Sequence, residues 1–164
     1  VWAMKRIVNF FKGARGEERV SGILRGLPDG YHVFNDYCVG RQHIDHVVVG
    51  PAGVFSIETK NWSGKITIEE GYILLNGKLP SRSPLNQALK ESMHVNSHLA
   101  KLGWNGDVTP VIAFASNTFD ARVAELKGSV VMNSNELLSA FSTKRVVIPQ
   151  PELDRLVALL ENEQ

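Results

Sequence analysis

Residues 44–60 have the sequence IDHVVVGPAGVFSIETK. Two short apolar runs flank a Gly-Pro-Ala-Gly turn at residues 50–53, a pattern that predicts a β-hairpin of two nearly buried strands. Asp45, Glu58 and Lys60 interrupt the apolar runs with charge. Because residues two apart in a strand share a face, Glu58 and Lys60 should be neighbours, and closure of the hairpin brings Asp45 to the same end.

These three charges indicate chemistry, because buried charge is costly unless it is paired or bound to a metal. Two nearby carboxylates, Asp45 and Glu58, with the Thr59 backbone carbonyl between them suit a hard cation such as Mg²⁺. A neighbouring lysine can position a water or stabilise developing negative charge. The alternative interpretation is a surface aspartate beside an ordinary Glu–Lys pair at a strand end.

The chain has 164 residues, of which 43% are hydrophobic and 21% charged, and this predicts one ordinary globular domain. The net charge of +1 does not by itself indicate a nucleic-acid-binding protein. Residues 1–26 are nevertheless rich in lysine and arginine, whereas the charged residues among the last fourteen are mainly acidic. Opposite charge at the two ends of the chain fits a phosphate-facing side and a solvated side. An amphipathic helix with ordinary surface charge explains it equally well.

Cysteine usage and hydropathy limit the environment of the chain. A single cysteine, Cys38, excludes an internal disulfide and a cysteine-based zinc site, and a reducing, cytoplasmic compartment is the simplest expectation. No run of about 18 apolar residues is present, so no membrane-spanning segment is expected. Because Val1 is not an initiator methionine, we expect a fragment or a processed product.

The periodicity of the remaining chain predicts further elements on both sides of the hairpin. Residues 1–11 form either a short helix or a connection, and Gly13 to Gly16 should open a helix that ends near residue 25. We then expect strands at 31–37, 65–69, 72–75, 110–115 and 129–132, and helices at 83–102, 136–141 and 151–160. This order predicts a mixed sheet flanked by helices.

Several motifs occur in order along residues 13–115. They are Gly16-Glu17, then QHIDHVVV at 42–49, GVFSIETKN at 53–61, Gly64, and PLNQ at 84–87. Together they resemble the NERD (nuclease-related domain) family of the PD-(D/E)xK nuclease superfamily. The resemblance implies an α/β fold with a restriction-endonuclease-like core of order α-β-β-β-α-β.

The resemblance also implies domain limits and roles for individual residues. The domain would span 13–164, with its core at 13–115 and a C-terminal strand and helices at 128–162, after an N-terminal segment at 1–12. Its site would contain the metal-binding pair Asp45 and Glu58, the motif lysine Lys60, the helix acid Glu17 and the helix glutamine Gln87. Two positions, His43 and Thr59, depart from the family pattern without touching the acidic pair or the lysine.

The expected function is therefore a metal-dependent, endonuclease-like phosphodiesterase. Asp45, Glu58 and the Thr59 carbonyl would hold Mg²⁺ or Mn²⁺, Lys60 would orient the water, and Glu17 and Gln87 would support them. The partner would be nucleic acid, DNA rather than RNA, and a homodimer is possible. Its phosphates would contact basic residues, for which the candidates are Arg15, Arg19, Arg41, Lys65 and Lys90.

Two other functions remain open from the sequence. The same fold could bind nucleic acid or recruit a partner without cutting it, or the chain could be another phosphate-transfer enzyme, although it has no Gly-rich phosphate loop. His94 and His98 have the spacing of a metal pair, but a solvated helix face explains them more simply. His43 shares a strand face with Asp45 and could approach the site. Trp62 could pack in the core or stack on a base.

Overall fold

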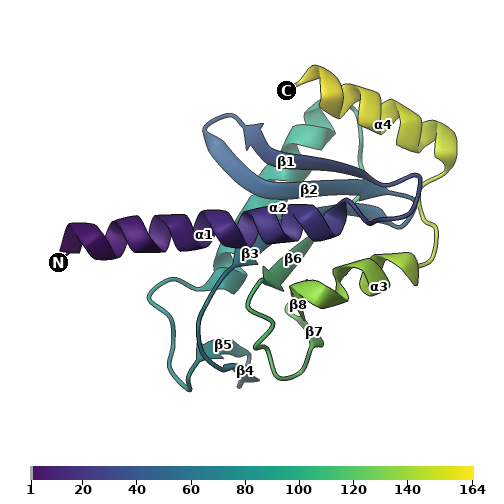
Figure 1. Ribbon diagram of the computed structural model, residues 1–164. Helices are drawn as coiled ribbons and strands as arrows, with labels where there is room; N and C mark the ends of the chain where they lie inside the picture. Colours follow the sequence, from purple (N-terminus) through teal and green to yellow (C-terminus); the bar gives the residue numbers. More distant parts are fainter. Residues whose placement is uncertain (1) are drawn as a thin grey trace.

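The computed structural model describes residues 2–164. A six-stranded mixed sheet lies at its centre, and a separate two-stranded sheet lies near one end (Figure 1). The elements in chain order are α1 (Trp2–Leu24), β1 (His32–Val39), β2 (Gln42–Gly50), β3 (Gly53–Lys60), β4 (Ile66–Glu69), β5 (Tyr72–Leu75), α2 (Pro84–Lys101), β6 (Val108–Phe114), β7 (Val123–Leu126), β8 (Ser129–Asn133), the 3₁₀ turn η1 (Ser134–Glu136), α3 (Leu137–Ser142) and α4 (Gln150–Asn162).

The strand order in the large sheet is β1-β2-β3-β6-β8-β7. Strands β1, β2 and β3 form an antiparallel meander, β6 and β8 continue the sheet in parallel, and β7 closes its edge antiparallel to β8. Helix α2 connects β3 to its parallel neighbour β6, as parallel pairing requires. The succession α1-β1-β2-β3-α2-β6 confirms the expected core order, with the β4–β5 hairpin inserted before α2.

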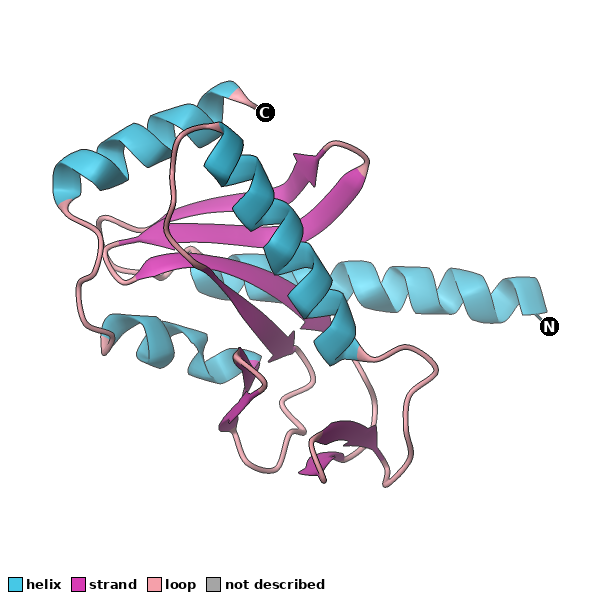
Figure 2. Cartoon of the chain, turned by 180° about the vertical axis from the view of Figure 1, so that it is seen from behind, coloured by secondary structure: helices cyan, strands magenta, loops and turns pink. Residues whose placement is uncertain are grey.

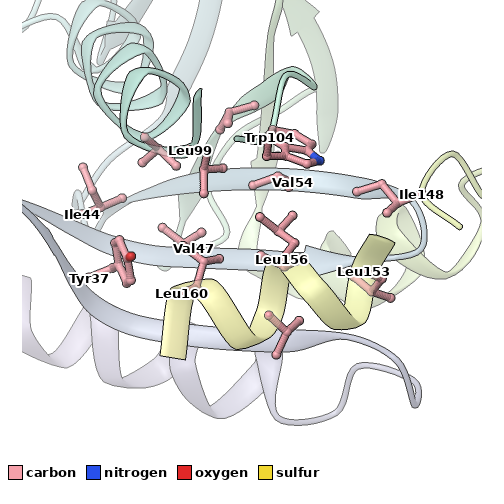
Figure 3. Close-up of a cluster of buried hydrophobic side chains, with 14 residues drawn as sticks. Tyr37, Ile44, Val47, Val54, Leu99, Trp104, Ile148, Leu153, Leu156 and Leu160 are labelled. Carbon is pink, nitrogen blue, oxygen red and sulfur yellow. The ribbon is translucent and has the colours of Figure 1, made fainter. Parts of the chain in front are cut away.

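Helices cover both faces of the sheet. Helices α1 and α3 pack on one face, where Val20 and Leu24 meet Phe55 and Phe141. Helices α2 and α4 cover the other face, and Figure 2 shows α2 crossing it. Figure 3 shows the cluster there, in which leucines of α4 lie over side chains of β1 and β2. Strand β3 is therefore buried on both faces, which explains its almost continuous apolar sequence.

Helix α2 begins where its sequence predicts. The Ser83 hydroxyl accepts a hydrogen bond from the Asn86 backbone N–H at 3.2 Å, and Pro84 occupies the first helical position. Both features satisfy or avoid unpaired N–H groups at a helix start. This start places the first turn of α2 beside the end of β3, where Lys60 bonds Gln87.

Helix α1 is longer than the sequence pattern indicates. Instead of a new helix opening at Gly13 to Gly16, one continuous helix runs from Trp2 to Leu24, so the N-terminal segment is helical and joined to the core helix. Glycine costs a helix only about 1 kcal/mol, and no proline occurs in this stretch to stop it. The first half of α1 extends beyond the sheet in Figures 1 and 2. No helix among residues 2–164 is long and apolar enough to cross a membrane.

Two local features of this region are not visible in the sequence pattern. The Asn133 side chain does not cap the helix that follows it; its amide group instead bonds the Phe119 backbone N–H and carbonyl at 2.9 and 2.8 Å. The edge strand β7 was not predicted, since its four residues alternate only between exposed and half-buried positions. Both features tie residues 117–126 to the end of β8.

We predict opposite effects of alanine at two glycines of α1. A Cβ at Gly16 would lie 2.7 Å from the Cβ of Asn61, whereas a Cβ at Gly13 would meet nothing within 4 Å. Gly16→Ala should therefore lower the free energy of unfolding by about 1–3 kcal/mol, despite the better helix propensity of alanine. Gly13→Ala, the matched control, should raise it by about 0.5–1 kcal/mol. Urea denaturation measures both, and an unchanged or more stable Gly16→Ala protein would show that this helix–strand contact is not tight.

Candidate active site

The site forms where β3 separates from β2. The paired register of these strands ends at His46 and Ile57, so Asp45 and Glu58 lie one residue beyond it. The Asp45 Oδ2 atom accepts a hydrogen bond from the Thr59 backbone N–H at 2.8 Å. An aspartate carboxylate thus replaces the strand partner of Thr59, while Lys60 still pairs with β6 through its carbonyl. This exchange fixes the Asp45 carboxylate beside the backbone of β3.

Lys60 and Gln87 connect the end of β3 to α2. The Lys60 ammonium donates to the Glu58 Oε1 atom and, at 2.9 Å, to the Gln87 Oε1 atom. The Gln87 Nε2 atom in turn donates to the Glu91 Oε1 atom at 3.0 Å. The amide of Gln87 is therefore held at both ends. This chain of bonds gives the Lys60 ammonium a defined position next to the carboxylates.

The site carries more negative than positive charge. Glu58 and Glu91 are 3% and 7% exposed, and the half-buried Asp45 lies beside them. Burial, reinforced by the charge of Glu58, raises the pKa of Asp45 to about 7. Burial also raises the pKa of Glu58 to about 7, against the opposing effect of Lys60, and it raises the pKa of Glu91. One lysine does not balance these three carboxylates.

Oxygen atoms suited to a divalent cation are available in this site. The buried Glu58 Oε2 and Glu91 Oε2 atoms have no hydrogen-bond partner. The Thr59 carbonyl points to the same side of β3 as its N–H, and so toward Asp45. Carboxylate and carbonyl oxygens are the ligands of Mg²⁺ and Mn²⁺. Nowhere in residues 2–164 are three or more His, Cys, Asp or Glu side chains grouped to hold a metal. A cation here would therefore keep several waters, as Mg²⁺ usually does.

The carboxylates open into a cleft of about 600 Å³ between α1 and the chain that follows β3. Lys12 donates to the Ser63 hydroxyl, and the Asn61 side-chain amide donates to the Lys12 carbonyl at 2.8 Å. These bonds join α1 to the segment after β3. Residues on both walls line the cleft, among them Asn9, Lys12, Glu17, Asn61, Trp62, Ser63 and Gln87.

The structure gathers the sequence-predicted site residues around this cleft. Asp45, Glu58, Thr59, Lys60 and Gln87 meet at its floor, and Glu17 lines its α1 wall. The charge of Glu17 is close enough to contribute to the raised pKa of Asp45.

The five basic residues proposed to contact phosphate lie outside the cleft lining. Arg19 donates to the Ala115 carbonyl at 2.8 Å and so holds the end of β6 against α1. Arg15 and Arg41 are exposed, Lys65 is 3.9 Å from Asp120, and Lys90 borders a separate hollow on α2.

Sequence reasoning missed Glu91. Like Gln87, which the family resemblance placed in the site, Glu91 turns toward the carboxylates of β2 and β3. The spacing of four residues between them was the available signal, because such residues share one helix face. Lys12 and Asn61 were also missed; Asn61 directly follows the Glu-x-Lys motif.

The histidines and Trp62 take different places. His43 bonds Asp36 at 2.8 Å on an exposed surface outside the cleft lining, so it does not approach the site as its strand face had suggested. The His98 Nε2 atom lies 3.3 Å from the Tyr37 hydroxyl. Trp62 packs against Phe114, with ring centroids 5.6 Å apart, and also lines the cleft. Both proposed roles of Trp62 are thus compatible with its position.

Comparison with known proteins gives a family match and a short stretch of similarity to an uncharacterized relative. A family model described as "nuclease-related domain" matches residues 12–115, well over half of the chain. An uncharacterized protein of Bacillus anthracis is 38% identical over 69 residues, which cover 38% of this chain and 32% of the relative. The chain therefore matches about a third of that relative's length. No solved structure gives a significant match.

The raised carboxylate pKa values predict how stability depends on pH in metal-free protein. Because the folded-state pKa of Glu58 lies above its unfolded value of about 4.5, folding favours the protonated form, and this stability is lost as pH rises toward 7. Glu58→Gln removes the titration. The free energy of unfolding of the variant minus that of the wild type should therefore grow with pH, by up to about 1.4 kcal/mol per unit between pH 5 and 7.

Chemical denaturation at pH 5, 6, 7 and 8 in the presence of a chelator measures this difference. Glu161→Gln, at an exposed position on α4, is the matched control and should show no such trend. A difference for Glu58→Gln that stays constant with pH would show that Glu58 ionises normally in the folded protein.

Proposed function

This chain belongs to the nuclease-related domain family, and we propose that it is a metal-dependent nuclease that hydrolyses phosphodiester bonds in nucleic acid. One observation carries the proposal: Asp45, Glu58 and Lys60 converge where β3 leaves β2, in a group with an excess of buried negative charge. Such an arrangement destabilises the fold unless a cation balances it. Sites of this kind are retained for chemistry.

Asp45, Glu58 and the Thr59 carbonyl are the proposed ligands of Mg²⁺ or Mn²⁺. When bound, such an ion lowers the pKa of a coordinated water and polarises a phosphate oxygen. The unpartnered Glu58 Oε2 atom and the fixed Asp45 carboxylate supply the required oxygens. The Glu91 carboxylate lies close to that of Glu58 and adds negative charge beside the proposed ligands.

Lys60 is the proposed group that acts on the water or the phosphate. Its ammonium has three N–H donors, and two of them are used on Glu58 and Gln87. The third is free to donate to an attacking water or to a phosphate oxygen as negative charge develops. Gln87 acts as a positioning residue, because its side-chain oxygen accepts a hydrogen bond from Lys60 while its side-chain nitrogen donates one to Glu91.

The walls of the cleft suit a nucleic-acid backbone. Lys12 supplies positive charge, and Asn9, Asn61 and Ser63 supply neutral hydrogen-bonding groups. The partly exposed Trp62 ring gives a surface on which a base could stack. We propose DNA in preference to RNA, with Arg15, Arg41, Lys65 and Lys90 contacting phosphates further from the cleavage point. The single free cysteine fits a cytoplasmic location.

A cleavage assay tests the proposal. Plasmid DNA, single-stranded DNA and RNA are incubated with the purified chain, with and without Mg²⁺ or Mn²⁺. The wild type should cleave at least one substrate only with metal, and Asp45→Asn, Glu58→Gln and Lys60→Ala should each lower the rate at least about 100-fold. Lys78→Ala, an exposed lysine outside the cleft, should leave the rate unchanged.

Each other outcome has a defined meaning. Full activity in Asp45→Asn or Glu58→Gln would overturn the assignment of the site. If calorimetry shows that a divalent ion binds but none of the three substrates is cut, the metal site is present and the enzyme acts on a different substrate. Absence of both cleavage and metal binding would favour a non-catalytic module on this fold.

The Lys60–Gln87–Glu91 chain predicts a separable effect on turnover. Gln87→Ala should lower kcat about 10- to 100-fold while the Mn²⁺ affinity measured by calorimetry stays within about twofold. Glu91→Ala should behave similarly, and Glu91→Gln should restore most of kcat, because its amide oxygen can still accept from Gln87. Weaker Mn²⁺ binding in Glu91→Gln would instead show that Glu91 is itself a metal ligand.

A further inference from the structure

The first half of α1 carries large apolar side chains that the described chain leaves uncovered. Met4 and Phe10 are 70% and 73% exposed, and Ile7, Val8 and Phe11 are more than half exposed. This part of the helix projects past the sheet in both Figure 1 and Figure 2. Clusters of this kind on a protein surface mark sites of interaction.

These side chains form one face of the helix. At 3.6 residues per turn, successive residues are about 100° apart. The apolar residues then fall within a single arc of about 160°; they are Ala3, Met4, Ile7, Val8, Phe10 and Phe11. The remaining arc holds Lys5, Arg6, Asn9 and Lys12, with Trp2 among them. The stretch is therefore an amphipathic helix.

The apolar face points away from the domain. In the second half of α1, the buried positions Gly16, Val20 and Leu24 lie at the angles of the polar arc. Asn9 and Lys12, which belong to that arc, line the cleft of the candidate active site. The apolar face of the first half is thus on the opposite side of the helix from the core. The sheet that buries the second half cannot cover it.

Positive charge borders the apolar face on both edges. Lys5 lies beside Val8 at one edge, and Arg6 lies beside Phe10 at the other. Arg82, from the loop before α2, adds a cation across a shallow hollow from Phe10. Residues 2–16 contain no aspartate or glutamate. Pairing with the same helix of a second copy would bring like charges together, which disfavours that occupant.

We propose that this face of α1 lies in the surface of an anionic lipid membrane. The apolar side chains would enter the boundary between headgroups and acyl chains, and the bordering lysines and arginines would reach lipid phosphates. An amphipathic helix of this kind would lie along the membrane surface. The polar arc, which lines the cleft, then faces away from the lipid. This proposal does not depend on the nuclease activity.

Vesicle co-sedimentation of the whole chain tests the proposal. Vesicles of phosphatidylcholine with 30% phosphatidylserine are compared with vesicles of phosphatidylcholine alone, at low and high salt. Binding should be at least tenfold stronger on the anionic vesicles and should weaken with salt. The double variant Phe10→Ser/Phe11→Ser should bind them at least tenfold more weakly. Thermal unfolding should be unchanged, because both side chains are exposed.

A matched double variant, Leu79→Ser/Met93→Ser, removes two equally exposed apolar side chains elsewhere and should bind like the wild type. Equal binding by the phenylalanine variant and the wild type would overturn the proposal, as would no binding to anionic vesicles. Sedimentation equilibrium of the wild type and the phenylalanine variant tests whether the face binds a second copy of the chain. A dimer that requires Phe10 and Phe11 would assign the face to a second copy of the chain and overturn the assignment to lipid.

Discussion

The structure depends on one hydrogen bond, from the Thr59 backbone N–H to the Asp45 carboxylate. In an uninterrupted hairpin, this N–H would pair with the backbone of β2. Here a side chain takes that place, so β3 leaves β2 while it continues to pair with β6. The separation opens the sheet at one end, and it directs Glu58 and Lys60 into the space that α1 and α2 enclose. Local disruption of the sheet thus creates the site.

The energetic cost of this arrangement is the burial of carboxylates. Their raised pKa values show that the metal-free fold favours the protonated forms, and the chain could relieve this with ordinary apolar residues. The surrounding core is large enough to tolerate it, because β3 is packed on both faces by helices. The packed strands and α2 hold the charged groups together. The favourable packing energy of the core thus offsets the unfavourable burial of the carboxylates at the site.

Helix α1 serves two environments along its length. Its second half packs on the sheet through Gly16, Val20 and Leu24. Its first half forms a cleft wall with its polar arc and presents the opposite, apolar arc to the outside. A single continuous helix therefore carries a core contact, a cleft wall and an exposed apolar face.

The sequence by itself determined the hairpin, the order of the core elements and the meeting of Asp45, Glu58 and Lys60. Alternation and apolar runs are local, and a hairpin brings its strand ends together whatever surrounds it. Only the tertiary structure decided that Glu91 joins the site and that Asn133 bonds Phe119. A helical pattern shows which residues share a face, but the partner of that face comes from segments far away in the chain. Local propensity has no access to such contacts.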